Sequence, residues 1–291
     1  MKLFIKKVLG FALIPLLVLF GLIIILISQQ KSAENKFELD ANVSTLFMGD
    51  SHVQQAINDS LLVESKNLGV DSESFFFTYH KLKSYLTANK QIKKVNLGFS
   101  YHSLSSYFDA YISGEYSRTV SLRYFNDLPA SDRMTCILWN SDNISSYLKE
   151  LIFLGDGSSK SVTVGYRNTF TKSKAKKSSM DKRIKFQFYS DGQVNGFSSI
   201  NLEYLDLIIA LCKEKDIELV LINTPMHPYY QDKIPAEFIR KYQEIVAMNN
   251  LEIIDFASFT LDDDCFIPDG DHVSVEGAKR VAEYLLNKEP R

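Results

Sequence analysis

Short apolar runs alternate with amphipathic helical patterns along most of the chain after residue 43. The runs have the length of strands, and the segments between several of them repeat apolar residues at helical spacing. Such alternation predicts an α/β fold, with a parallel sheet of about five strands and helices on both faces. We expect strands at 43–48, 66–70, 93–99, 217–224 and 251–257, and helices at 54–65, 79–89, 202–215, 236–250 and 274–288.

The middle of the chain, from about residue 105 to residue 195, does not follow this alternation. It is rich in Tyr, Phe and Ser and contains a basic run over 171–185. We interpret it as an insertion that elaborates the same domain near the mouth of a site. A solvated surface loop is the alternative interpretation.

The N-terminus predicts a membrane anchor. Lys2, Lys6 and Lys7 precede an uncharged run over 8–28, which is long enough to cross a bilayer as a helix. Because basic residues favour the cytoplasmic side, the N-terminus should be cytoplasmic and the rest extracytoplasmic. We expect a single-pass anchor at 1–29 and a linker at 30–42. A cleaved signal peptide is the alternative, although such peptides have shorter apolar regions and small-residue cleavage sites.

The charge and the motifs of the chain argue against a nucleic-acid partner, a cofactor and a metal. The anchor carries three of the 33 basic residues and none of the 35 acidic ones, which leaves a net charge of −5 on the rest. This charge argues against a nucleic-acid partner. The sequence contains no phosphate-binding glycine motif, so we expect no cofactor. Its acidic cluster near 262–271 lacks the spacing of an EF-hand, so we expect no metal.

Chemistry-bearing residues follow the predicted strands. Ser51 comes directly after the first strand, in Gly49-Asp50-Ser51, and Asp269 and His272 lie just before the last helix. Parallel sheets bind ligands beyond the carboxyl ends of their strands. A serine nucleophile needs a base and a group that orients the base, and a D-x-x-H turn can supply both.

These two motifs together resemble those of the SGNH (GDSL-type) hydrolase superfamily. The resemblance covers about 43–288, and thus the predicted domain at 43–291. It implies a three-layer, flavodoxin-like sandwich in which Ser51 is the nucleophile, His272 the base and Asp269 its partner. Members of the family stabilise the oxyanion with the backbone of the nucleophile, a glycine and an asparagine.

The chain departs from the family at two of these oxyanion positions. Asn67 and Gly69 match the second block, but Ser72 stands at its last glycine. In the third block Ser100 stands where the asparagine is expected. We therefore expect Ser51, Ser72 and Ser100 to surround the oxyanion. Three histidines near the predicted strand ends are candidate substrate contacts: His52, His102 and His227.

The resemblance implies a serine esterase or O-acyltransferase. We expect an acyl ester, such as an acetyl ester, of a cell-envelope or exported glycan as its substrate. The alternative is an inactive, membrane-anchored protein of the same fold that binds or helps to assemble a glycan. The sequence leaves the acyl group, the acceptor and the oligomeric state open.

Overall fold

The computed structural model describes residues 37–153, 164–171 and 173–288, together with Phe11, Leu13, Leu17, Phe20 and Gly21. Apart from these five residues, the predicted anchor lies outside the described residues, as does the first half of the linker. Within the described part of the chain, no helix combines the length and the apolar character needed to cross a membrane.

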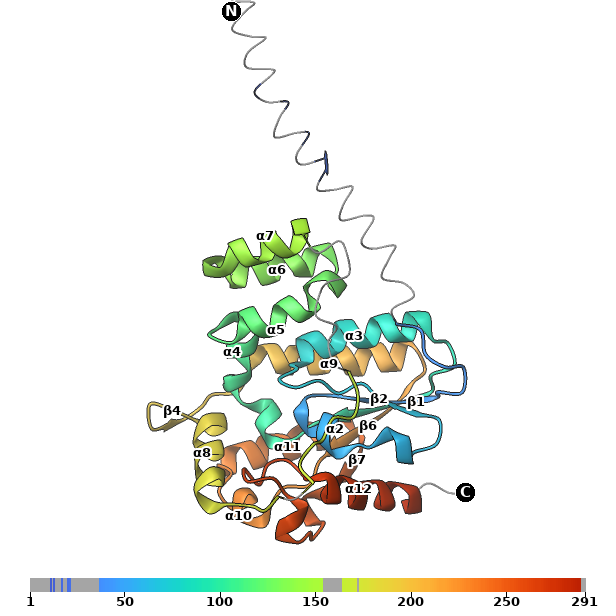
Figure 1. The fold of residues 1–291 in the computed structure, drawn as a ribbon, viewed down its shortest axis with the longest axis vertical. Coiled ribbons are helices and arrows are strands. Elements are labelled where there is room, and N and C mark those ends of the chain that lie inside the picture. Colours follow the sequence, from blue (N-terminus) through green and yellow to red (C-terminus); the bar gives the residue numbers. More distant parts are fainter. Residues whose placement is uncertain are drawn as a thin grey trace, which may run out of the picture.

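Five parallel strands form the central sheet, in the order β2-β1-β3-β6-β7 (Figure 1). Their bounds are β1 Thr45–Met48, β2 Ser65–Asn67, β3 Lys94–Gly98, β6 Glu218–Asn223 and β7 Glu252–Asp255. Counted along the chain, this is the flavodoxin-like order, which confirms the predicted α/β fold. The order reverses between β1 and β3, so the loops that follow these two strands open at the position where such sheets bind ligands.

Helices cover both faces of the sheet because successive strand residues point to opposite faces (Figure 1). Leu46, Met48 and Val95 pack with the helices of one face, and Phe47 and Val220 pack with those of the other. The first face carries α3 Phe75–Ala88 and α9 Ser199–Glu214, with side chains from α11 Ala236–Asn249; the second carries α2 Ser51–Ala56 and α12 Val275–Lys288.

The predicted helix at 54–65 is wrong in its bounds, because α2 begins at Ser51 and ends at Ala56. The side chain of Asn67 explains where it ends. Its amide donates to the backbone oxygens of Val53 and Ile57, at 3.0 and 2.6 Å, and so takes up acceptors at the C-terminal end of the helix.

Helices, rather than a solvated loop, make up most of the described residues of the inserted segment (Figure 1). They are α4 Asp109–Ser113, α5 Ser117–Tyr124, α6 Ala130–Trp139, α7 Ile144–Phe153 and α8 Lys177–Phe188, followed by the short strands β4 Tyr189–Ser190 and β5 Gln193–Val194. Helices α4 to α7 share a small buried core with the start of α3. Within it, the rings of Phe77 and Tyr124 stack with centroids 4.5 Å apart.

A stability test follows from the close approach of two backbones beside β2. A Cβ on Gly69 would lie 2.6 Å from the backbone nitrogen of Gln54, so Gly69→Ala should lower the free energy of unfolding by about 1–3 kcal/mol. Urea denaturation measures this change. Gly196→Ala is the matched control, because no atom lies within 4 Å of its added Cβ. Equal effects of both substitutions would contradict the steric explanation.

Candidate active site

The turn between β1 and α2 presents Ser51. Gly49 adopts a φ of +146°, which a residue with a side chain rarely adopts, and a Cβ there would lie 2.8 Å from Val53 Cγ2. Asp50 then caps the helix, because its Oδ1 accepts the backbone N–H of His52 at 2.9 Å. Ser51 is therefore the first residue of α2, in the loop region just beyond the end of β1, which lies beside the central strand β3.

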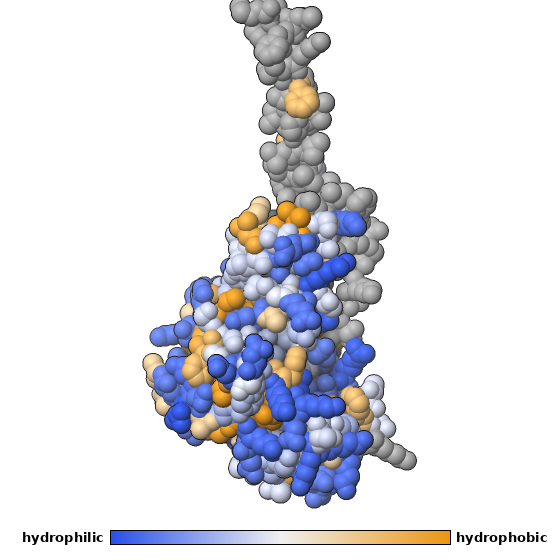
Figure 2. Space-filling model, turned by 90° about the vertical axis from the view of Figure 1, so that its left-hand side faces the viewer, coloured by the Kyte–Doolittle hydropathy of each residue, from blue (hydrophilic) through white to orange (hydrophobic). Residues whose placement is uncertain are grey.

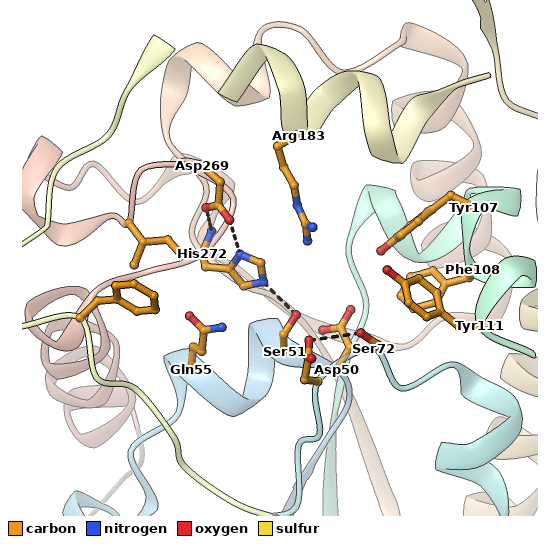
Figure 3. A pocket seen from close by; sticks show the side chains of 13 residues that line it. Asp50, Ser51, Gln55, Ser72, Tyr107, Phe108, Tyr111, Arg183, Asp269 and His272 are labelled. Atoms are coloured by element: carbon orange, nitrogen blue, oxygen red, sulfur yellow. Dashed lines mark hydrogen bonds and ion pairs between the residues drawn. The ribbon is translucent and has the colours of Figure 1, made fainter. Parts of the chain in front are cut away.

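Ser51, His272 and Asp269 form a continuous chain of hydrogen bonds (Figure 3). His272 Nδ1 lies 2.9 Å from Asp269 Oδ2, and its Nε2 lies 2.8 Å from Ser51 Oγ. A carboxylate only accepts, so Nδ1 carries the proton and Nε2 is left to accept from the serine hydroxyl. The three residues are in the geometry that a nucleophile, a base and an orienting group require.

The turn before α12 holds Asp269 in place. Asp269 Oδ1 accepts the backbone N–H groups of Asp271 and His272, both at 3.1 Å. Burial would raise the pKa of Asp269, but the adjacent imidazole of His272 outweighs burial and lowers that pKa. Asp269 is therefore ionised at neutral pH and can stabilise a positive charge on His272.

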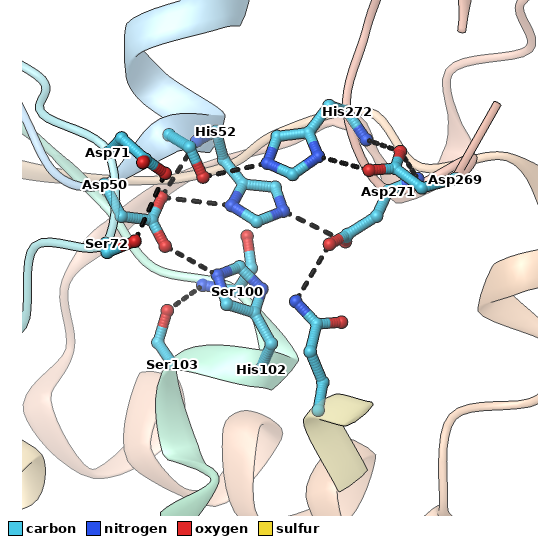
Figure 4. Close-up of polar contacts among 12 residues, drawn as sticks. Asp50, His52, Asp71, Ser72, Ser100, His102, Ser103, Asp269, Asp271 and His272 are labelled. Carbon is cyan, nitrogen blue, oxygen red and sulfur yellow. Dashed lines mark hydrogen bonds and ion pairs between the residues drawn. The ribbon is translucent and has the colours of Figure 1, made fainter. Parts of the chain in front are cut away.

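A second, buried ion pair lies beneath the triad (Figure 4). His52 places Nδ1 3.0 Å from Asp50 Oδ1 and Nε2 2.9 Å from Asp271 Oδ1. A carboxylate oxygen lies within 3.0 Å of each ring nitrogen, and this pair of negative charges favours the imidazolium form of His52. Burial would lower the pKa of His52, but the charges of Asp271 and Asp50 raise it to about 10. The same contacts outweigh burial and hold the pKa values of both carboxyls well below their usual range.

Three imidazole rings stack through this region. The ring of His52 lies between those of His102 and His272, with centroid distances of 3.9 and 4.2 Å. Burial and the neighbouring His52 charge lower the pKa of His102, which is therefore neutral and donates from Nε2 to Asp50 Oδ2 at 2.8 Å. The charged ring of His52 thus lies beside the neutral ring of His102.

The clustered histidines and aspartates raise the question of a metal. Potential ligand atoms come together in two groups. One group is Asp50, His52 and His102, and the other is His52, Asp271 and His272. The rings are nearly parallel, however, with interplanar angles of 27° and 19°. Imidazole binds a metal in the plane of its ring, so stacked rings do not direct their lone pairs at one point. The arrangement suits the ion pairs described above and does not suit a shared cation.

The triad opens into a cavity of about 210 Å³ (Figure 3). Ser51, His272 and Ser72 lie on its walls. The inserted segment and the loops beside it contribute the aromatic and cationic part of the lining: Tyr107, Phe108, Tyr111, Phe170 and Arg183. Arg183 extends from α8 toward the space in front of the triad (Figure 3). Its Nε donates to Asp271 Oδ2 at 2.8 Å, which ties the insertion to the D-x-x-H turn.

Ser72 and Ser100, which were expected at the oxyanion together with Ser51, lie in different places. Ser72 lines the cavity and has a φ of +62°, the left-handed conformation that glycine adopts without strain. Ser72 thus adopts a backbone conformation that a glycine at this position would adopt without strain. Ser100 is buried outside the cavity lining, and its hydroxyl and backbone form a capping box with Ser103. Its expected role at the oxyanion therefore does not fit its position.

The three histidines expected to contact substrate also lie outside the cavity lining. His52 and His102 are 3% and 2% exposed and are used in the ion-pair network. His227 caps α10 Pro228–Gln231 and contacts Asp263 Oδ1 at 3.1 Å, while its backbone N–H donates to Gly270. These positions correct the sequence expectation, because all three imidazoles contact aspartates and none lines the cavity.

Sequence reasoning missed Asp271 and Arg183. Asp271 lies inside the D-x-x-H turn and is fully buried, but the motif gives no indication of which way its side chain points. Arg183 is one of many cations in the basic run. Helix α8 decides which of them faces the site, and the apolar positions Met180, Ile184 and Phe188 that bury this helix were the available signal.

The comparisons with known proteins give distant similarities in fold. No protein-family model matches the chain, and no curated protein matches it. A structure of a provisionally assigned platelet activating factor from Streptococcus pneumonia is 13% identical, with a TM-score of 0.44, over 95% of this chain and 98% of that one. A provisionally assigned lipolytic protein of the G-D-S-L family from Desulfitobacterium hafniense is 12% identical, with a TM-score of 0.41, over 84% and 98%.

A GDSL-like lipase from Bacteroides thetaiotaomicron is similar at 8% identity and a TM-score of 0.40, over 91% of this chain and 97% of that one. The chain resembles the SGNH hydrolases in its motifs. The contact of Ser51 with His272 brings the Gly-Asp-Ser and D-x-x-H motifs together. They meet at the edge of the sheet where the strand order reverses between β1 and β3.

The charge on His52 predicts a pH dependence of stability. The pKa of His52 is about 10 in the folded protein and 6.5 in the unfolded chain. Its contribution to the free energy of unfolding is therefore complete below pH 6.5 and is lost as the pH rises through about 10. Between pH 7 and 9 this group should lower the free energy of unfolding by about 1.4 kcal/mol per pH unit. Urea denaturation across this range measures the slope.

Two variants test the origin of this slope. His52→Gln should remove the slope and cost about 3–5 kcal/mol at pH 6, because it removes the positive charge that lies between two buried carboxylates. His227→Gln should retain the slope, because the His227 side chain contacts Asp263 and neither Asp50 nor Asp271. Equal slopes in the wild type and in His52→Gln would show that His52 is not the group that titrates.

Proposed function

We propose that the chain is a serine esterase or O-acyltransferase that works through an acyl-enzyme on Ser51. The observation that carries this proposal is the hydrogen-bonded series from Ser51 through His272 to Asp269 at the wall of a cavity. In the SGNH hydrolases that the chain resembles, the same residue types at the same places are catalytic. A non-catalytic glycan-binding protein would not need this series to be intact.

The geometry supports a two-step reaction. Ser51 Oγ attacks the acyl carbonyl while its proton passes to His272 Nε2, and Asp269 stabilises the imidazolium. The tetrahedral intermediate then collapses: the ester C–O bond breaks, and His272 returns the proton to the departing alcohol. Water or an acceptor hydroxyl attacks the acyl-enzyme, with His272 again as the base, and Ser51 is released.

The oxyanion is expected to rest on backbone donors. The N–H groups of Ser51 and Ser72 are the proposed donors, because these residues lie together at the cavity. The asparagine of the family has no counterpart at Ser100, so this hole has one donor fewer. Loss of one such donor typically lowers the rate by about 10²–10³. The enzyme is therefore expected to be slow on simple esters.

The lining of the cavity supports a short acyl group on a glycan. A volume of about 210 Å³ suits a small acyl group such as acetyl. Tyr107 and Tyr111 border the cavity and offer ring faces on which a sugar can stack. With the predicted anchor, these features support a single-pass membrane protein whose extracytoplasmic domain acts on a cell-envelope or exported glycan.

The nucleophile is tested with a serine-reactive fluorophosphonate and with p-nitrophenyl acetate. We expect the wild type to be labelled and to hydrolyse the ester, and Ser51→Ala to lose both while it keeps its unfolding midpoint. Ser190→Ala, an exposed serine outside the cavity lining, is the control and should behave as the wild type. A folded wild type that shows neither labelling nor turnover would contradict the proposal.

The backbone role of Ser72 gives a separate prediction. A non-glycine residue in the left-handed conformation costs on the order of 1 kcal/mol, so Ser72→Gly should raise stability slightly and retain kcat/KM. Ser72→Val should lower both the stability and kcat/KM, because a β-branched side chain disfavours the left-handed conformation more strongly. If Ser72→Gly lost tenfold or more in kcat/KM, the hydroxyl rather than the backbone would be the donor.

A further inference from the structure

The outermost helices of the insertion carry an apolar face that no other described element covers. Met134, Leu138 and Trp139 of α6 are 55%, 70% and 37% exposed, and Ile144 at the start of α7 is 47% exposed. Ala130, Met134 and Leu138 lie four residues apart, so they form one outward stripe along α6. The opposite side of α6 buries Cys136 in the core of the insertion.

This apolar face lies at one end of the molecule (Figure 1). Helices α6 and α7 lie farthest from α12, beyond the face of the sheet that α3 and α9 cover. Figure 2 shows apolar residues gathered at the same end. Trp139 contacts α3 through Phe76, with ring centroids 5.7 Å apart, so α6 is attached to the α3 side of the sheet.

The continuous described chain begins on the same side of the sheet. Phe37 packs against Tyr85 near the C-terminal end of α3, with ring centroids 5.2 Å apart. Only eight residues, 29–36, separate Phe37 from the uncharged run at 8–28. Fully extended, eight residues reach at most about 29 Å. If the run crosses a bilayer, as we propose, the α3 side of the domain is held close to the lipid surface.

We propose that the apolar face of α6 and α7 rests on that lipid surface. Aliphatic side chains at the tip with a tryptophan beside them are the composition that the membrane–water boundary favours. Lys149 of α7 is exposed, and a long basic side chain of this kind can reach lipid phosphates. This contact rests on the proposed anchor and is independent of the ester chemistry of Ser51.

The chain itself supplies the probe, because Trp139 is its one tryptophan. The full-length protein is reconstituted into vesicles of phosphatidylcholine and phosphatidylglycerol, with and without bromine atoms on the acyl chains. Bromine quenches tryptophan only at short range, so contact with the lipid should shift the Trp139 emission to the blue and remove most of it in brominated vesicles. Turnover of p-nitrophenyl acetate in the same samples reports separately on the proposed active site.

Substitutions distinguish the apolar face from other surfaces. Leu138→Glu and Ile144→Glu should abolish the quenching and leave the ester turnover unchanged. Val63→Glu is the control, because Val63 is 75% exposed but lies outside α6 and α7, and it should keep the quenching. Unquenched emission in the wild type would overturn the proposal. Emission that shifts with protein concentration and not with bromine would also overturn it, and would assign the face to a second copy of the chain.

Discussion

The ion pair of His52 with two buried aspartates is the interaction on which the site depends. Asp50 belongs to the turn after β1 and Asp271 to the turn before α12, so His52 joins the segment that presents Ser51 to the segment that presents His272. All three groups are buried and charged, and breaking one buried pair typically costs about 3–5 kcal/mol. The geometry of the triad therefore depends on the paired charges beneath it. Arg183 supplies a second positive charge to Asp271.

This arrangement also makes the insertion part of the candidate active site. Helix α8 contributes Arg183 and Gln187, and both donate to Asp271 Oδ2 at 2.8 Å. Tyr230 in turn donates to Gln187, so the D-x-x-H turn is supported from two further elements. The aromatic wall of the cavity comes from the same inserted segment. The proposed nucleophile and the cavity beside it are thus held by one connected set of contacts.

The sequence predicted the five strands and the meeting of Ser51 with His272 and Asp269, because strand periodicity and short motifs are local signals. The places of His52 and His102 could not be predicted in this way. Their stacking depends on the separation of β1 from the loop after β3, which only the assembled sheet defines. The same limit applies to Arg183, whose direction follows from the packing of α8. The left-handed backbone at Ser72 is easier to predict, because the resemblance places a glycine at this position.

The insertion leaves and re-enters the sheet at neighbouring strands. Strands β3 and β6 are paired from Lys94 opposite Glu218 to Gly98 opposite Ile222, although more than a hundred residues lie between them in the chain. The connection can therefore lengthen or shorten without a change in the register of any strand. An evolving protein of this architecture can alter the reach of its site and the substrates it admits by changing this one segment, while the nucleophile and its charged support stay where the sheet puts them.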